Sequence, residues 1–321
     1  MARGAQVLAL WVALSAGLFG LVHVLPGSPE AQLLAAHPEL SADDVARVRA
    51  LEGLDLPITT RYRCWLLGRN PACPRWPSRA GVLDGELGWS RLYQRPVREL
   101  LQERLPNTLA LMGPALGISV LLSVLLGLLA ATRQRWDRAV AWVVAVGLAM
   151  PAHWLGLLVI LVFAVGLGWL PSGGVRGFDG GGRGAYLVLP VAVLSVYYVG
   201  RYTRYLRAAL KEELGKPYLD TARAKGLSEA QVLLRHALPN ALIPLLTVVA
   251  QSLPVLFSGA LVVERVFAYP GMGLLIFESV EERDHLVAVT VFLIYAALTF
   301  VAAGVADVGY WLLDPRVRRR S

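Results

Sequence analysis

Residues 217–246 read PYLDTARAKGLSEAQVLLRHALPNALIPLL, a polar and basic stretch within a mostly apolar chain. Pro217 suits the first turn of a helix, and Gly226 suits the left-handed backbone position that ends one. Ser228, with Gln231 three residues later, forms a capping-box pattern, so a second helix is predicted to begin at once in a new direction. The stretch therefore predicts two short helices that meet at a tight corner and lead directly into an apolar helix.

The chain around this stretch has the composition of a membrane protein. It has 321 residues, of which 56% are hydrophobic and 17% charged, whereas soluble domains are about half apolar and about a quarter charged. Five long segments carry no charge, and each can contain a helix of roughly 17 to 25 residues, the length that crosses a bilayer core. These segments are residues 105–132, 139–175, 184–200, 237–263 and 286–306.

A sixth apolar run opens the chain at residues 4–25. A secretory signal peptide is one interpretation, because Arg3 precedes an apolar segment rich in small residues. We favour a retained first span, since the run is long, lacks an A-x-A-like cleavage site and ends at Pro26. The sequence therefore predicts an all-α integral membrane protein with six transmembrane helices, the first in residues 1–25 and five in a core of residues 104–313.

Lysine and arginine gather in three places that a six-span topology puts on one side of the membrane. They are the loop at residues 133–138, the segment 201–235 and the tail DPRVRRRS at residues 314–321. By the positive-inside rule this side is cytoplasmic, and both termini lie there. The net charge of +8 then reflects topology and does not require a nucleic acid. Residues 26–103 become a large extracytoplasmic loop after the first helix.

Both cysteines, Cys64 and Cys73, lie in this outer loop. An oxidising compartment and the nine-residue separation favour a disulfide between them. The spacing alone leaves two unpaired thiols as the alternative.

A second predicted outer loop, residues 267–286, carries an acidic run. Such a run can dock a partner or a cationic ligand, but for any single carboxylate we favour a solvated loop. The acidic residues are Glu278, Glu281, Glu282 and Asp284, and they accompany one arginine, Arg283.

Sequence motifs for catalysis are absent. The chain has no G-x-x-x-x-G-K-[ST] phosphate loop, no G-x-S-x-G nucleophile motif and no histidine, cysteine or carboxylate set at metal-ligand spacing. We therefore predict that the chain is not an enzyme and binds no cofactor or metal itself. Facing charged groups near mid-membrane, typical of proton-driven carriers, are also largely missing.

A few uncharged polar residues lie in the predicted spans. They are candidates to line a path, although tyrosine at a span end is more often an interface anchor and a lone glutamine more often a packing group. These residues are Ser195, Tyr197, Tyr198, Gln251 and Ser252.

The stretch at residues 217–246 resembles the coupling loop of binding-protein-dependent ABC importer permeases. That loop has the pattern E-A-A-x-x-x-G, then nine residues, then I-x-L-P; this chain has D-T-A-x-x-x-G, nine residues and H-A-L-P. The matching residues are Ala222, Gly226, Leu238 and Pro239, and the departures are Asp220, Thr221 and His236.

Nearly the whole chain is similar to the dipeptide and oligopeptide permeases of the B-subunit type. The order and spacing of several motifs carry this resemblance, and the two cysteines depart from it. The motifs include PGSP at 26–29, GELGWS at 85–90, PAHWLGLLVILVFAVGLGWLPSGG at 151–174, VERVFAYPGMGLL at 263–275 and LLDPRVR at 312–318.

The resemblance implies the type I ABC importer permease fold in a bacterial inner membrane, with a coupling segment within residues 211–238 that docks on an ATPase. It implies a second homologous permease, two ATPase subunits that bind ATP and magnesium, an extracytoplasmic solute-binding protein and a peptide cargo. Nickel or another small solute stays open as cargo, and a self-sufficient secondary carrier or a membrane scaffold is the rival function. The docking residues would be Asp220, Thr221, Ala222, Arg223, Ala224, Lys225, Gly226 and Leu227, with Ser228, Gln231, Leu238 and Pro239 in support.

Overall fold

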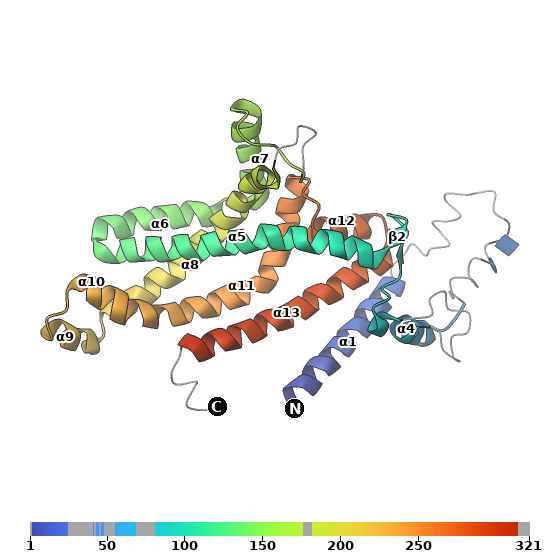
Figure 1. The fold of residues 1–321 in the computed structure, drawn as a ribbon, viewed down its shortest axis with the longest axis horizontal. Coiled ribbons are helices and arrows are strands. Elements are labelled where there is room, and N and C mark those ends of the chain that lie inside the picture. Colours follow the sequence, from blue (N-terminus) through green and yellow to red (C-terminus); the bar gives the residue numbers. More distant parts are fainter. Residues whose placement is uncertain are drawn as a thin grey trace. The chain divides into compact units, whose positions relative to one another are not determined.

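A computed structural model of the chain describes residues 2–24, 41, 43–44, 46–47, 55–68, 81–175 and 182–313 (Figure 1). The chain forms two compact units. The first comprises residues 1–105 and 275–297, and the second comprises residues 106–274 and 298–321. The basic tail predicted at residues 314–321 lies outside the described residues.

The first unit has a small aromatic core. Phe19 contacts Trp65 and Tyr62, with ring centroids 5.4 Å and 5.6 Å apart, and Val289 and Leu293 complete the cluster. Its elements are α1 (Ala2–Val24), α4 (Ile58–Leu67), the single turn η1 (Val82–Asp84) and the antiparallel pair β1 (Trp89–Ser90) and β2 (Arg95–Pro96). The first turns of α5 (Val97–Thr132) and parts of α12 (Met272–Glu281) and α13 (His285–Leu313) also belong to it.

Two carboxylates of the acidic run have structural hydrogen-bond partners. Asp284 is only 2% exposed, and its carboxylate accepts hydrogen bonds from the Ser90 hydroxyl at 2.6 Å and the Leu92 amide at 3.1 Å. Glu278 accepts a hydrogen bond from the Tyr93 hydroxyl. The interpretation of every carboxylate here as merely solvated is therefore wrong for these two, because β1 and the residues after it supply donors from far away in the sequence.

The second unit is a bundle of long helices in which α8 packs against α6, α7 and α11. Glycine allows close approach of α6 and α8, since a Cβ on Gly200 would lie 3.3 Å from the Val144 carbonyl oxygen. The elements of this unit are α5 (Val97–Thr132), α6 (Gln134–Ala149), α7 (Ala152–Val159), η2 (Ile160–Gly166), α8 (Arg183–Leu214), α9 (Pro217–Ala224), α10 (Glu229–Gln231), η3 (Val232–Ala237), α11 (Leu238–Val266), the start of α12 (Met272–Glu281) and the end of α13 (His285–Leu313).

Four helices among the described residues are long and apolar enough to cross a membrane. A bent pair of helices counts as a fifth span if it crosses as one, and the predicted number of six stays a prediction. The four are residues 97–132, 184–214, 229–254 and 285–304.

The charge-free segment 139–175 is not one straight helix. It bends by 98° between α6 and the helix that begins at Ala152. Met150 has an extended backbone, with φ −85° and ψ 120°, because the ring of Pro151 disfavours the helical conformation in the residue before it. The lack of charge marks this segment as apolar but does not indicate the bend at Pro151.

A buried carboxylate near the end of α11 organises the turn that follows this helix. Glu264 is fully buried and accepts hydrogen bonds from the Thr108 hydroxyl at 2.7 Å and the Leu274 amide at 2.9 Å. A Cβ on Gly271 would lie 2.1 Å from a Glu264 carboxylate oxygen, so this position requires glycine. In the motif VERVFAYPGMGLL, the turn after α11 therefore packs against Glu264 of the same motif.

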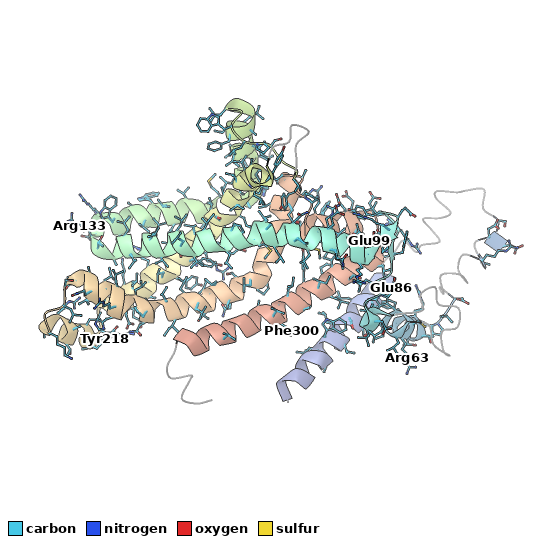
Figure 2. The ribbon with its side chains drawn as sticks, in the orientation of Figure 1. Arg63, Glu86, Glu99, Arg133, Tyr218 and Phe300 are labelled. Atoms are coloured by element: carbon cyan, nitrogen blue, oxygen red, sulfur yellow. The ribbon has the colours of Figure 1, made fainter. Side chains whose placement is uncertain are left out.

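Two arginine-rich segments lie at the same end of the second unit. The Asp137 carboxylate at the start of α6 pairs with Arg207 and with Lys211, whose Nζ atom lies 2.7 Å away. Arg133 marks the turn between α5 and α6, and Tyr218 lies on α9 (Figure 2). The shared location of residues 133–138 and 201–235, which the sequence predicts, is confirmed.

Candidate functional site

Helix α9 presents one buried and one exposed face. Leu219 and Ala222 are buried and lie on the side where α9 packs against η3, whereas Thr221 and Ala224 are exposed. Pro217 occupies the first turn, as the sequence predicts. A helix fixed on one side and free on the other has the form of a docking element.

The corner after α9 depends on Gly226, whose φ is +84°. The Gly226 amide donates to the Arg223 carbonyl at 2.9 Å, and the Leu227 amide donates to the Ala222 carbonyl at 3.4 Å. This pair of bonds is the Schellman arrangement, which places its left-handed residue at this position. The predicted glycine corner is confirmed, and no atom lies within 4 Å of where a Cβ would be, so the need for glycine comes from the backbone alone.

The capping box after the corner is also confirmed. The Gln231 amide donates to the Ser228 hydroxyl at 3.4 Å, and the Ser228 amide donates to the Gln231 side chain at 3.0 Å. These two bonds satisfy backbone donors that a helix start leaves without partners.

The predicted second short helix is not separate from the membrane helix that follows. Residues 229–254 form one long helix, in which Val232–Ala237 is a wider π-helical turn. Pro239 has no backbone N–H, and its ring crowds the carbonyl of the residue four positions before it, which accounts for a widened turn at this point. Residues 229–237 are therefore continuous with α11, without a break at Pro239.

Arg223, one of the predicted docking residues, forms ion pairs within this segment. Its guanidinium donates to the Glu229 carboxylate at 2.9 Å and to the Asp220 carboxylate at 2.8 Å. Both bonds raise the pKa of Arg223 above its usual value, and the bond to Glu229 has the larger effect. Arg223 thus ties α9 to α10, and the exposed charges that α9 presents are Asp220 and Lys225.

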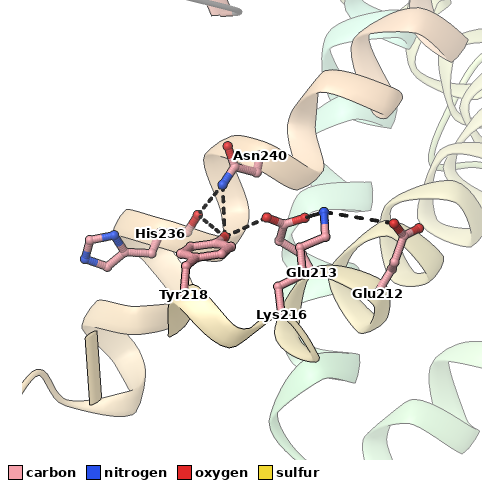
Figure 3. A network of polar contacts seen from close by, with 6 residues as sticks. All are labelled: Glu212, Glu213, Lys216, Tyr218, His236 and Asn240. Atoms are coloured by element: carbon pink, nitrogen blue, oxygen red, sulfur yellow. Dashed lines mark hydrogen bonds and ion pairs between the residues drawn. The ribbon is translucent and has the colours of Figure 1, made fainter. Parts of the chain in front are cut away.

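A polar network holds the base of α9 (Figure 3). The Tyr218 hydroxyl donates to the Glu213 carboxylate at 2.6 Å and accepts from the Asn240 amide at 2.9 Å. Lys216 Nζ lies 2.5 Å from the other Glu213 oxygen, and Asn240 also donates to the His236 carbonyl at 3.1 Å. Three elements, α8, α9 and α11, therefore meet at one hydroxyl group.

The charges of this network are mutually stabilised. Glu213 is only 6% exposed, and a buried carboxylate requires partners. The hydrogen bond from Lys216 to Glu213 raises the pKa of Lys216. The pKa of Tyr218 is raised mainly by burial, and secondly by its hydrogen bond to the Glu213 carboxylate. Lys216 therefore stays protonated and Tyr218 stays neutral at physiological pH.

Sequence reasoning missed this network. Tyr218 and Asn240 are 22 residues apart, and no short-range pattern links residues at that separation. The available signal was a pair of acidic residues, Glu212 and Glu213, in an otherwise basic segment.

The uncharged polar residues named as path candidates divide into two groups. Ser195, Tyr198 and Ser252 are buried within the unit, where the Ser252 hydroxyl shares a hydrogen bond with Tyr202. Tyr197 and Gln251 are exposed on the surface of the unit. Only these two can contact anything outside it.

Cys64 is buried in α4 and is not a free thiol. Cys73 lies outside the described residues, so the pairing of these two cysteines stays a prediction.

Among the residues that the structure describes, no group of three or more potential ligands could hold a metal ion. The arrangement at residues 211–240 is one of packing, caps and ion pairs. It can bind a protein surface and transmit displacement between helices.

Comparison with known proteins matches residues 123–319 to the family described as "Binding-protein-dependent transport system inner membrane component". The chain is 34% identical over 306 residues to the oligopeptide transport system permease protein AppB of Bacillus subtilis, covering 93% of this chain and 92% of that protein. It is 35% identical over 303 residues to the glutathione transport system permease protein GsiC of Salmonella choleraesuis, covering 94% and 92%.

Solved structures share the fold. The MetNI methionine ABC transporter in an inward-facing conformation aligns with a TM-score of 0.55 and 21% identity, covering 67% of this chain and 96% of that chain. An amino acid ABC transporter aligns with a TM-score of 0.52 and 17% identity, covering 65% and 92%.

Proposed function

Since the chain belongs to the family of binding-protein-dependent transport system inner-membrane components, we propose that residues 217–227 are the segment through which an ATPase drives transport across it. The chain is the permease component of an ABC importer, a multi-pass inner-membrane protein and not an enzyme. Partner ATPases and a substrate-binding protein belong to such a system.

The observation that carries the coupling proposal is the rigid, half-exposed helix α9. Its buried face, the Gly226 corner and the Arg223 ion pairs fix its orientation, while Thr221 and Ala224 stay exposed. A generic basic loop needs none of these features. A helix with one face free and its position fixed fits a cleft on a partner subunit.

The network around Tyr218 supports a route for displacement. Closure of nucleotide-bound ATPases would move α9, and the Tyr218 hydroxyl joins α9 to Glu213 of α8 and to Asn240 of α11. Movement at the ATPase would then reach two membrane helices together and convert an inside-open arrangement into an outside-open one.

We expect Tyr218→Phe to weaken this route while leaving the apolar ring in place. One hydrogen bond is worth roughly 0.5–1 kcal/mol net, so the ATP hydrolysed per cargo molecule should rise about two- to fivefold. The measurement is paired hydrolysis and uptake in proteoliposomes.

Tyr205→Phe is the matched control. Tyr205 is 40% exposed on α8, and its hydroxyl makes no hydrogen bond with the described residues, so the ratio should not change. An unchanged ratio in Tyr218→Phe would remove the network from the coupling route.

The proposed cargo is a dipeptide or oligopeptide. The relatives' names cite oligopeptide, peptide and glutathione transport, and the similarity covers nearly the whole chain. Nickel or another small solute carried by the same architecture is the alternative.

The proposed assembly has a second homologous permease, two ATPase subunits and one extracytoplasmic solute-binding protein. ATP and magnesium would bind the ATPases, and this chain would bind no cofactor. The end of the second unit that carries residues 133–138 and 201–235 would face the cytoplasm, with both termini on that side, because arginine and lysine collect there.

Uptake by reconstituted proteoliposomes tests the function. Radiolabelled tri-alanine should accumulate only when the binding protein and magnesium ATP are both supplied, and nickel should neither accumulate nor compete. Uptake driven by a proton gradient without ATP would instead establish the secondary carrier.

A further inference from the structure

Arg201 lies within the membrane-crossing length of α8. The candidate span is residues 184–214, and Arg201 precedes Arg207 by six residues, which is about 9 Å along a helix axis. Arg207 marks the charged end of the helix, where it pairs with Asp137. The residue next to Arg201, Gly200, packs on Val144 and Leu148 of α6, so this level of the bundle is apolar.

Arg201 forms no ion pair and no hydrogen bond with the residues that the structure describes, and its side chain is half-buried. Arg207, two turns away, is fully engaged with a carboxylate. A cation at membrane depth is costly in lipid, and such residues face the interior of a bundle or a water-filled cavity. Arg201 therefore requires water or an anion from outside this unit.

The surface around Arg201 is polar. Tyr197 lies one turn before it on the same face and is 38% exposed. Gln251 of α11 is exposed too, and it adjoins Ser252, whose hydroxyl bonds to the neighbour of Arg201, Tyr202. Arg201 on α8 and Gln251 on α11 thus each adjoin a residue of the hydrogen bond that joins the two helices.

A different face of α8 has the opposite character. It borders a hollow of about 600 Å³ lined almost entirely by apolar side chains, among them Ile118, Val143, Val188 and Val196. Val196 and Tyr197 are adjacent residues, so the two faces are offset by about 100° around the helix. The apolar face suits lipid or another apolar surface, and the polar face suits an aqueous path.

We propose that Arg201 lines the aqueous translocation path and binds the carboxylate of the passing cargo. Arginine forms paired, charge-assisted hydrogen bonds with carboxylates, and every peptide with a free C-terminus carries one. Tyr197 and Gln251 supply neutral hydrogen-bonding groups beside it. The carboxylate assignment rests on the proposed peptide cargo; the placement of Arg201 in an aqueous path does not.

The first test measures exposure to water. Arg201→Cys and Val196→Cys are each prepared in the complete transporter and reconstituted in nanodiscs. Both are then treated with a thiol-reactive methanethiosulfonate whose charged sulfonate group keeps it out of the membrane. We expect Arg201→Cys to react at least about tenfold faster than Val196→Cys, because lipid excludes charged reagents. If Arg201 instead reached a lipid phosphate from within hydrocarbon, the short cysteine would be unreactive, and the proposal would fail.

The second test measures the charge. In proteoliposomes supplied with tri-alanine, Arg201→Gln should lower uptake about tenfold, while Arg201→Lys should keep most of it because the cation remains. ATP hydrolysis should stay within about twofold of wild type in both, which shows that the ATPases are still docked. Arg204→Gln is the matched control, since Arg204 is exposed one turn nearer the charged end and lies over the Tyr205 ring.

Full tri-alanine uptake by Arg201→Gln, or an equal loss in Arg204→Gln, would overturn the carboxylate contact. Failure of wild type to import any peptide would overturn the proposed cargo, and the thiol reaction would still report on the path. The two failures are therefore distinguishable.

Discussion

Gly226→Val is expected to uncouple ATP hydrolysis from cargo uptake while the permease still inserts in the membrane and its ATPases still hydrolyse ATP. The φ of +84° is outside the range that a β-branched residue tolerates, and such strain costs about 1–3 kcal/mol. No neighbouring atom lies within 4 Å of a new Cβ, so the change acts through the backbone alone. The corner must open, and α9 would then leave the position set by its buried face.

The ratio of ATP hydrolysed to peptide imported measures this uncoupling. It should rise by about fivefold to a hundredfold in Gly226→Val, since a strain of about 1–3 kcal/mol lowers the population of the native corner by roughly these factors. Gly215→Val is the matched control, because Gly215 ends α8 in the same segment with a φ of −84° and its Cβ would meet the nearest atom at 3.6 Å. Normal import by Gly226→Val would show that the corner does not couple hydrolysis to transport.

The local features of the coupling segment could be predicted because their causes are local. A glycine with positive φ and a serine with glutamine three residues on each act within a few residues of chain, and both lie where the sequence indicates. The charge-free segments likewise mark the long helices, because apolar length is a property of consecutive residues.

Features that depend on distant parts of the chain could not be predicted. In the sequence, Asp284 has the pattern of a loop carboxylate, and only the fold places Ser90 within hydrogen-bond distance of it. The hydrogen bonds of Tyr218 to Glu213 and Asn240 likewise form only in the folded chain. Hydrogen-bond partners of this kind are chosen by tertiary packing, which a single sequence does not encode in a short pattern.

The bend at Pro151 and the continuity at Pro239 show a different limit. Both are prolines in apolar surroundings, yet one follows an extended residue and a 98° bend, while the other lies just inside a continuous helix. Proline removes a donor in both places, and the packing of the neighbouring turns decides whether the chain bends or widens.

Site-directed photocrosslinking from Ala224 tests the central claim most directly. Ala224 is exposed on α9, and we expect benzoylphenylalanine at this position to crosslink the permease to its ATPase in the intact complex. The same group at Trp142, which is 74% exposed on α6, should give no ATPase adduct. The claim that residues 217–227 dock on the ATPase predicts an adduct from Ala224 alone; a complex that retains its ATPase but forms no adduct from Ala224 would contradict it.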